Sequence, residues 1–140
     1  MTGRFEGSQR REILSATACW ELLETHRLGR LATAADGRPD IIPVNYRAQD
    51  HTVYFKSAEG SKLAALTVNP QVAFEVDGMS ENAAWSVVVH GTATVVQSFG
   101  EMAVLDELGI EPWEKGAKYN YIAITADQVT GRRLSGVDAV

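Results

Sequence analysis

The dipeptide Asp36-Gly37 lies between two segments whose residues divide into two alternating faces, residues 28 to 35 and residues 40 to 48. Asp-Gly is a favoured pair for the two-residue turn of a β-hairpin, because both turn positions need a positive φ. Two alternating faces on either side of such a turn are typical of the paired strands of a hairpin. Pro43 cannot donate a hydrogen bond to a second neighbouring strand, so the second strand is expected at a sheet edge or at a bulge.

The rest of the chain continues this pattern of short strands and turns. Short helices are predicted over residues 15 to 26, after Gly60-Ser61 as far as Asn69-Pro70, and over residues 100 to 108. Because strands dominate and the helices lie between hairpins, the pattern favours a mainly β antiparallel barrel over a βαβ sheet. Further strands are predicted at residues 53 to 55, 71 to 76, 85 to 97 with a bend at Gly91, and 119 to 125, with brief pairing at 129 to 134.

The composition limits the classes of function. A chain of 140 residues that is 45% apolar suits one domain, which we place at residues 13–140 behind a flexible N-terminal arm, residues 1–12. The net charge of −5 argues against a nucleic-acid partner. No segment resembles a signal peptide or a membrane span, so we expect a cytoplasmic protein without a membrane partner. With one cysteine and three scattered histidines, no metal site is expected.

The segment from Tyr54 to Lys62 is the candidate phosphate site. A strand ends in Lys56-Ser57, and Gly60 then leads into Ser61-Lys62 at the start of a predicted helix. A helix N-terminus presents unpaired N–H groups and a partial positive charge, so hydroxyls and a lysine there can hold a phosphate. The alternative is that Ser61 is an ordinary helix cap and both lysines are solvated.

The order of these motifs resembles the pyridoxamine 5'-phosphate oxidase-like split-barrel flavoproteins, most closely the short branch with nitroimidazole reductase-like proteins. The resemblance covers about residues 15 to 97, with a weaker continuation at residues 129 to 133. It rests on Gly29-Arg30-Leu31-Ala32, Asp36-Gly37-Arg38-Pro39, Ile42-Pro43-Val44-Asn45-Tyr46, Val53-Tyr54-Phe55, Gly60-Ser61-Lys62-Leu63, Asn69-Pro70-Gln71-Val72-Ala73 and Val89-His90-Gly91.

With the six strands predicted from the pattern, the resemblance implies a six-stranded antiparallel split β-barrel of the FMN-binding type, with FMN at the interface of a homodimer. It places the phosphate near Ser57, Ser61 and Lys62, and the isoalloxazine along the strand of Pro43, Val44 and Asn45. A small-molecule substrate follows, with a nicotinamide donor as one candidate reductant. Phe55 and Lys56 belong to the phosphate strand, and Trp85 is a candidate cover for the flavin, against the alternative of core or interface packing.

The chain also departs from the family pattern. Asp40 and Asn45 stand where the oxidase proper has an arginine and a lysine, and Leu63 replaces a second basic residue in the turn. Ser57, Ser61 and Lys62 would therefore carry more of the phosphate binding. The sequence favours an FMN-dependent oxidoreductase of unknown substrate. The alternatives are the same fold with the deazaflavin coenzyme or haem, or a non-enzymatic module that binds or sequesters flavin.

Overall fold

Eight strands and three short helices make up the computed structural model, which describes residues 9–116 and 118–136, without the side chains of residues 61–63. The helices are α1 (Ala16–Thr25), α2 (Ser61–Val68) and α3 (Phe99–Asp106). The strands are β1 (Arg10–Ile13), β2 (Leu28–Ala35), β3 (Arg38–Asn45), β4 (Arg47–Gln49), β5 (Thr52–Ala58), β6 (Gln71–Met79), β7 (Ala83–Val95) and β8 (Tyr119–Ser135).

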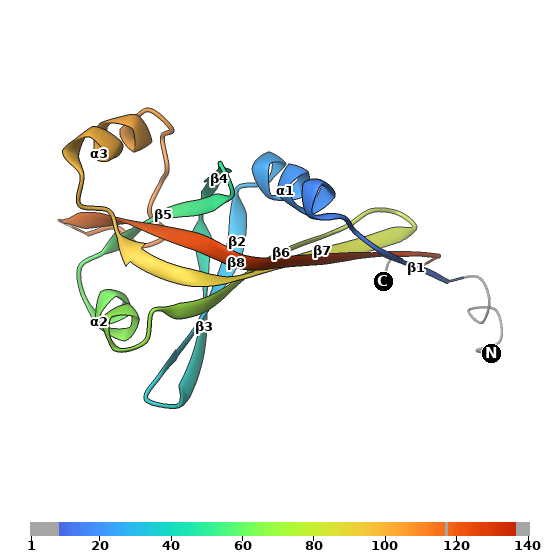
Figure 1. Ribbon diagram of the computed structural model, residues 1–140, viewed down its shortest axis with the longest axis horizontal. Helices are drawn as coiled ribbons and strands as arrows, with labels where there is room; N and C mark the ends of the chain where they lie inside the picture. The colour runs from blue at the N-terminus through green and yellow to red at the C-terminus, as the bar shows by residue number, and fades with distance from the viewer. Residues whose placement is uncertain (1–8, 117, 137–140) are drawn as a thin grey trace.

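One antiparallel sheet contains all of these strands (Figure 1). Its order is β3-β2-β6-β7-β8-β5-β4, and β1 pairs with β8 beside this path. The two end strands, β3 and β4, are consecutive in the chain and are separated only by Tyr46. The chain therefore passes directly from one edge of the sheet to the other, which requires the sheet to curl round. The mainly β, antiparallel barrel class predicted from the sequence is confirmed.

Local turn chemistry explains the first hairpin. Asp36 and Gly37 both have positive φ, 52° and 73°, as the predicted two-residue turn requires. β3 pairs only with β2 and has Pro43 opposite Arg30, so the predicted edge position of this proline is also confirmed. The predicted strand at residues 40 to 48 is in fact two strands, because the ladder breaks at Tyr46 where the chain changes edges.

The predicted count of six strands was too low. β8 continues without a break to Ser135 and pairs with β7 along its length, where the sequence pattern indicated one strand and a brief later contact. The register of this pair shifts between His90 and Gly91, at the predicted bend. Residues 10–12, assigned from the sequence to the flexible arm, lie in β1 and pair with the end of β8. Residues 1–8 lie outside the described part of the chain.

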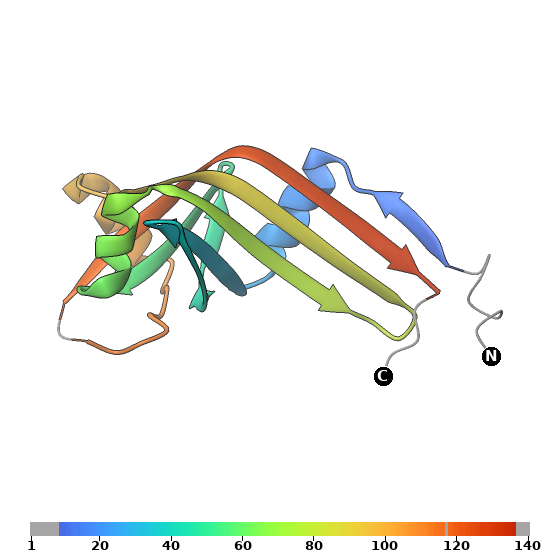
Figure 2. The ribbon, with the colours of Figure 1, turned by 90° about the horizontal axis from the view of Figure 1, so that it is seen from below.

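Two apolar clusters hold the fold together. The main cluster fills the space between the sheet and α1, which lies over the long strands β7 and β8 (Figures 1 and 2). Ser15 caps α1 by accepting a hydrogen bond from the Ala18 N–H at 3.1 Å. A second cluster includes Val96, Leu105, Ile110, Tyr121 and Ala123. None of the helices in the described part of the chain is long and apolar enough to cross a membrane.

Candidate functional site

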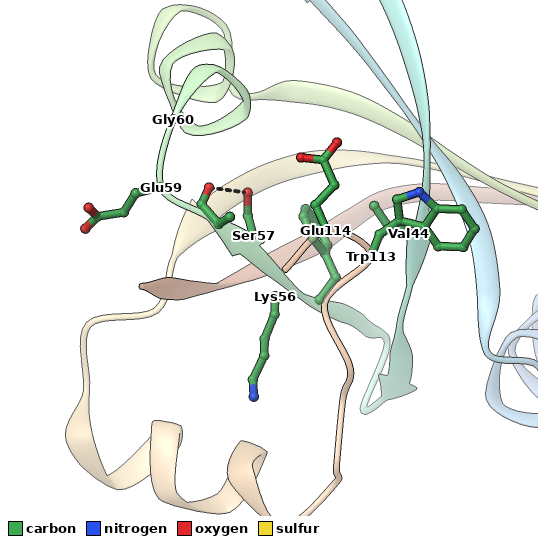
Figure 3. A pocket seen from close by; sticks show the side chains of 9 residues that line it. Val44, Lys56, Ser57, Glu59, Gly60, Trp113 and Glu114 are labelled. Atoms are coloured by element: carbon green, nitrogen blue, oxygen red, sulfur yellow. Dashed lines mark hydrogen bonds between the residues drawn. The ribbon is translucent and has the colours of Figure 1, made fainter. Parts of the chain in front are cut away.

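The candidate site is an open pocket of about 250 Å³ at the end of β5, which we call the β5 pocket. β3 contributes one wall, β5 and the turn after it form the floor, and the connector between α3 and β8 forms the other wall (Figure 3). Residues 55–60 of the sequence-predicted segment thus line a cavity. The lining residues are Val44, Phe55, Lys56, Ser57, Ala58, Glu59, Gly60, Trp113 and Glu114.

Alternation along β5 decides which side chains face the barrel interior. Val53, Phe55 and Ser57 are buried, whereas the residues between them are half-exposed. Ser57 is 4% exposed, and apart from the tyrosines it is the only residue with a polar side chain that is buried in the described part of the chain. Its hydroxyl donates a long hydrogen bond of 3.3 Å to the carbonyl of the adjacent Ala58. This weak local bond leaves the oxygen free to accept and the proton free to be redirected to a ligand.

The turn after β5 leads directly into the N-terminus of α2. Gly60 occupies the N-cap position with φ of 144°, a conformation that other residues adopt only with strain. Within the described part of the chain no side chain caps this helix end, so its first N–H groups keep their capacity to bind an anion. An ideal Cβ on Gly60 would meet nothing within 4 Å. The side chains of Ser61 and Lys62, both predicted to contact phosphate, lie outside the described residues.

Lys56 does not point toward the rest of the pocket (Figure 3). Its ammonium nitrogen lies over the Tyr121 ring, 5.3 Å from the ring centre. The Tyr121 hydroxyl donates to the Asp106 carboxylate at 2.5 Å. Burial, reinforced by Asp106, raises the pKa of Tyr121. Lys56 thus lines the pocket with its ammonium directed to the Tyr121 ring.

Other predicted site residues are divided among several places. Val44 lines the β5 pocket, whereas the preceding Pro43 pairs with Arg30 in the edge ladder. Asn45 lines a different cavity, together with Arg27 and Arg47. Trp85 lies at the far hairpin of β6 and β7, where its ring makes an edge contact with His26 at 4.7 Å between centres. Of the predicted set, Val44, Phe55 and Ser57 are therefore brought together with the start of α2.

Trp113 and Glu114 are pocket residues that the sequence pattern did not assign to the site. They lie in the connector between α3 and β8, near Val44 and Ser57 respectively (Figure 3). Trp113 is 49% exposed, which is unusual for the residue with the largest apolar side chain. A tryptophan in a polar connector bounded by Pro112 and Gly116 was the available signal, but periodicity cannot place a loop against a strand.

The arrangement can bind a planar, partly apolar molecule that carries an anionic group. Val44, Phe55 and Trp113 offer apolar surface, and the Ser57 hydroxyl and the uncapped α2 N-terminus offer hydrogen bonds to an anion. Among the described lining residues, Lys56 is the sole cation and Glu59 and Glu114 are acidic. Binding of an anion by this part of the chain would therefore depend on dipoles more than on charge.

Solved structures of similar proteins share this fold. A Corynebacterium glutamicum protein, provisionally described as a pyridoxamine 5'-phosphate oxidase, is 36% identical, with a TM-score of 0.83 over 90% of this chain and 99% of the other. The FAD-binding protein of Mycobacterium smegmatis is 38% identical, with a TM-score of 0.77 over 89% and 98% of the two chains. An FAD-binding protein of Mesorhizobium loti is 29% identical, with a TM-score of 0.77 over 88% and 97%.

The sequence itself matches a known protein family over residues 15–133, which is most of the chain. The matched region begins at the α1 N-cap and ends within β8, so it includes every element that forms the β5 pocket. The barrel, the pocket at the end of β5 and this match together assign the chain to the family described as pyridoxamine 5'-phosphate oxidase.

Proposed function

We propose that this protein is a flavin-dependent oxidoreductase that binds its flavin in the β5 pocket. The observation that carries the proposal is the buried Ser57 hydroxyl, which has only a weak local bond and lies next to the uncapped N-terminus of α2. A phosphate accepts hydrogen bonds from both kinds of donor. The FAD-binding relatives, at 38% and 29% identity, support a flavin as the molecule that carries this phosphate.

The residues of the pocket fit the parts of a flavin phosphate. Ser57 and the first N–H groups of α2 would hold the phosphate, and Lys62 is proposed to add charge there. Phe55, Val44 and Trp113 would pack against the apolar portion and exclude water from it. β3 is an edge strand, so part of its backbone near Pro43 and Asn45 has no ladder partner and can meet the polar edge of the ring.

The chemistry of such a site belongs mainly to the cofactor. A bound flavin supplies hydride or single-electron transfer, and the protein binds it, orients it and tunes it through hydrogen bonds. No described residue of the β5 pocket is needed as a covalent nucleophile under this proposal. A small-molecule substrate would therefore be selected by the shape of the pocket mouth beside Trp113.

We also propose that the site is completed by a second copy of the chain. The pocket, at about 250 Å³, is smaller than the roughly 300–1,000 Å³ typical of sites for ligands of this size. Trp113 remains half-exposed at its mouth. A flavin would extend beyond this wall, and a homodimer would supply the remaining surface. Size-exclusion chromatography with light scattering would test this, since a monomeric flavin-loaded protein would contradict it.

FMN is the proposed cofactor, and FAD is the second candidate because two relatives are FAD-binding proteins. FMN and FAD share the ring, the ribityl chain and the first phosphate, so the pocket chemistry described above serves either. The purified protein should be yellow, and mass spectrometry of the chromophore released by heat identifies it. A colourless protein that binds neither added FMN nor added FAD would contradict the whole proposal.

The oxidoreductase activity needs a separate test. Anaerobic mixing of the flavin-loaded protein with NADH or NADPH should bleach the flavin absorbance if a nicotinamide donor reduces it. A flavin that is bound tightly but reduced by neither donor would favour a module that binds or sequesters flavin. A deazaflavin or haem spectrum would instead show that the same fold binds a cofactor other than FMN or FAD.

A further inference from the structure

We infer that a second cavity, lined by Arg27, Asn45 and Arg47, binds a small oxyanion, either a carboxylate or a phosphate ester. This cavity, which we call the two-arginine cavity, has a volume of about 220 Å³. The inference goes beyond the proposed flavin function and does not depend on it. The remaining lining residues are Tyr46, Gly109, Ile110 and Glu111.

Strand alternation places this cavity on the opposite side of the chain from the β5 pocket. Val44 and Tyr46 are buried and point into the barrel, so Asn45 and Arg47 point the other way. Val44 lines the β5 pocket and Asn45 lines the two-arginine cavity, although the two residues are adjacent. A ligand in one cavity therefore does not occupy the other.

The register of β2 and β3 brings the two arginines to one place. Leu28 pairs with Asn45 at the end of this ladder, and the Tyr46 N–H donates to the Arg27 carbonyl at 2.9 Å. Arg47 follows directly as the first residue of β4. The backbone of Arg27 is thus bonded directly to that of Tyr46, and Arg47 is the next residue after Tyr46.

Arg27 has a structural role that uses only part of its guanidinium. Its Nη1 donates to the carbonyls of Glu24 and His26, at 2.8 and 3.0 Å, at the C-terminal end of α1. A cation here also suits the negative end of the helix dipole. These bonds hold the guanidinium in position, and its remaining N–H groups stay available to a ligand in the cavity.

Arg47 is the residue that most needs an explanation. It is half-buried, yet within the described part of the chain its guanidinium makes no hydrogen bond and no ion pair. Glu111 lines the same cavity but forms no ion pair with either arginine among the described contacts. Partly desolvating an unpaired charge costs free energy, and this applies to Arg47 and not to Arg27, which is exposed. An oxyanion between the two guanidinium groups would offset this cost and satisfy their planar donors.

The wall of the cavity formed by residues 109–111 is anchored by apolar packing. Ile110 is 3% exposed and packs into the second apolar cluster, so Gly109 and Glu111 are held beside the arginines. The volume is below that of sites for drug-sized ligands, roughly 300–1,000 Å³. The cavity therefore suits a small acid, or the acidic end of a larger molecule, and not a whole dinucleotide.

The test is binding of inorganic phosphate and of succinate to the flavin-free full chain, followed by NMR of the Asn45 amide and Arg47 Nε signals. We expect saturable shifts with at least one probe, and the stronger probe identifies the preferred oxyanion. Arg47→Gln should raise the dissociation constant about tenfold or more, the scale for loss of a charge-assisted bidentate partner. Arg38→Gln, an exposed arginine at the start of β3, is the matched control and should leave the dissociation constant unchanged.

Arg47→Lys keeps the positive charge but loses the planar guanidinium, so it tests whether the geometry of the donors matters. It is also the more conservative change and is less prone to disturb folding. It should bind the probe more weakly than the wild type while melting at a similar temperature. The inference is overturned if neither probe gives saturable shifts, or if Arg47→Gln and the wild type bind equally well. A titration of the same variants with FMN measures binding at the β5 pocket. Failure of the flavin proposal would therefore be distinguished from failure of the oxyanion inference.

Discussion

The Lys56 ammonium lies over the ring of Tyr121, 5.3 Å from its centre, on the opposite side of β5 from the buried Ser57. These two consecutive residues therefore serve different parts of the molecule. Ser57 faces the β5 pocket, whereas the Lys56 ammonium lies over Tyr121, whose hydroxyl donates to Asp106. Charge for a bound phosphate would have to come from elsewhere, with Lys62 as the proposed source.

Lys56→Met should barely change flavin affinity but should lower stability. Removing the cation from the Tyr121 ring should cost about 0.5 to 1 kcal/mol of unfolding free energy, the range for a partly exposed cation–π contact. Urea unfolding and a fluorescence titration with FMN measure the two effects separately. Lys56→Arg should retain stability because a guanidinium can occupy the same place. A loss of FMN affinity of more than about 1 kcal/mol in Lys56→Met would return this lysine to the phosphate site.

Ser57→Ala should show the opposite behaviour. The hydroxyl has one long bond, to the neighbouring Ala58 carbonyl, so its removal should change the unfolding free energy by less than about 0.5 kcal/mol. If Ser57 binds phosphate, FMN affinity should fall by about 1 to 2 kcal/mol. Riboflavin, which lacks the phosphate, provides the control ligand. Equal losses for FMN and riboflavin would place the serine at another part of the cofactor.

Lys62→Ala should weaken FMN binding by about 1 to 3 kcal/mol, the scale for losing a charge-assisted partner. The effect should shrink as salt is added, because dissolved ions screen the attraction between the lysine and the phosphate. Lys115→Ala, a change in the exposed connector, is a suitable control for the loss of one positive charge. Unchanged affinity in Lys62→Ala, measured by the same titration, would move the phosphate away from the start of α2.

Features of the fold that depend on local sequence could be predicted without the structure. The Asp36-Gly37 turn, the edge position of Pro43 and the bend at Gly91 each follow from the conformational limits of the residue itself. β1 could not be found this way, because residues 10–13 are all exposed and show no apolar alternation. Their strand conformation comes from hydrogen bonds to β8, at the other end of the chain.

The site was predictable only where alternation could be applied. Phe55 and Ser57 share one side of β5, and both line the pocket with Val44. The same alternation should have separated Lys56 from Ser57, since consecutive strand residues point to opposite sides. Trp113 was beyond sequence reasoning, because a connector has no period and its position depends on how α3 packs against β8. Alternation also explains why Asn45 lines a different cavity from its neighbour Val44.

Gly91→Ala should destabilise the barrel by about 1 to 3 kcal/mol, the range for overpacking a close contact. A Cβ at Gly91 would collide with the Thr125 carbonyl oxygen of β8, at the register shift between the strands. Gly100→Ala is the matched control, because the nearest atom to its Cβ would be the Ser98 hydroxyl at 3.7 Å, an ordinary contact. Urea unfolding of both variants decides the matter. Equal stability of the two would mean that β7 and β8 can separate locally at little cost.

The Glu75 carboxyl should make stability depend on pH in an unusual direction. Burial, together with the neighbouring Asp77, raises the pKa of Glu75 to about 7, and outweighs the ion pair with Arg30 at 3.1 Å. A carboxyl whose pKa is higher in the folded than in the unfolded chain holds its proton more tightly when folded. Its contribution is therefore fully present below pH 4.5, the ordinary value for Glu, and is lost as the pH rises to about 7.

Glu75→Gln should remove this pH dependence, because the amide does not titrate and resembles the protonated carboxyl in shape. Between pH 5 and pH 8 the wild type should lose about 1 to 2 kcal/mol from this group, a range reduced for its partial exposure to solvent. The variant should lose correspondingly less. Urea unfolding at several pH values gives the comparison, with Glu81→Gln in the exposed β6–β7 turn as the control for charge. Parallel pH profiles for the wild type and Glu75→Gln would show that Arg30 keeps Glu75 ionised, so that the salt bridge outweighs burial.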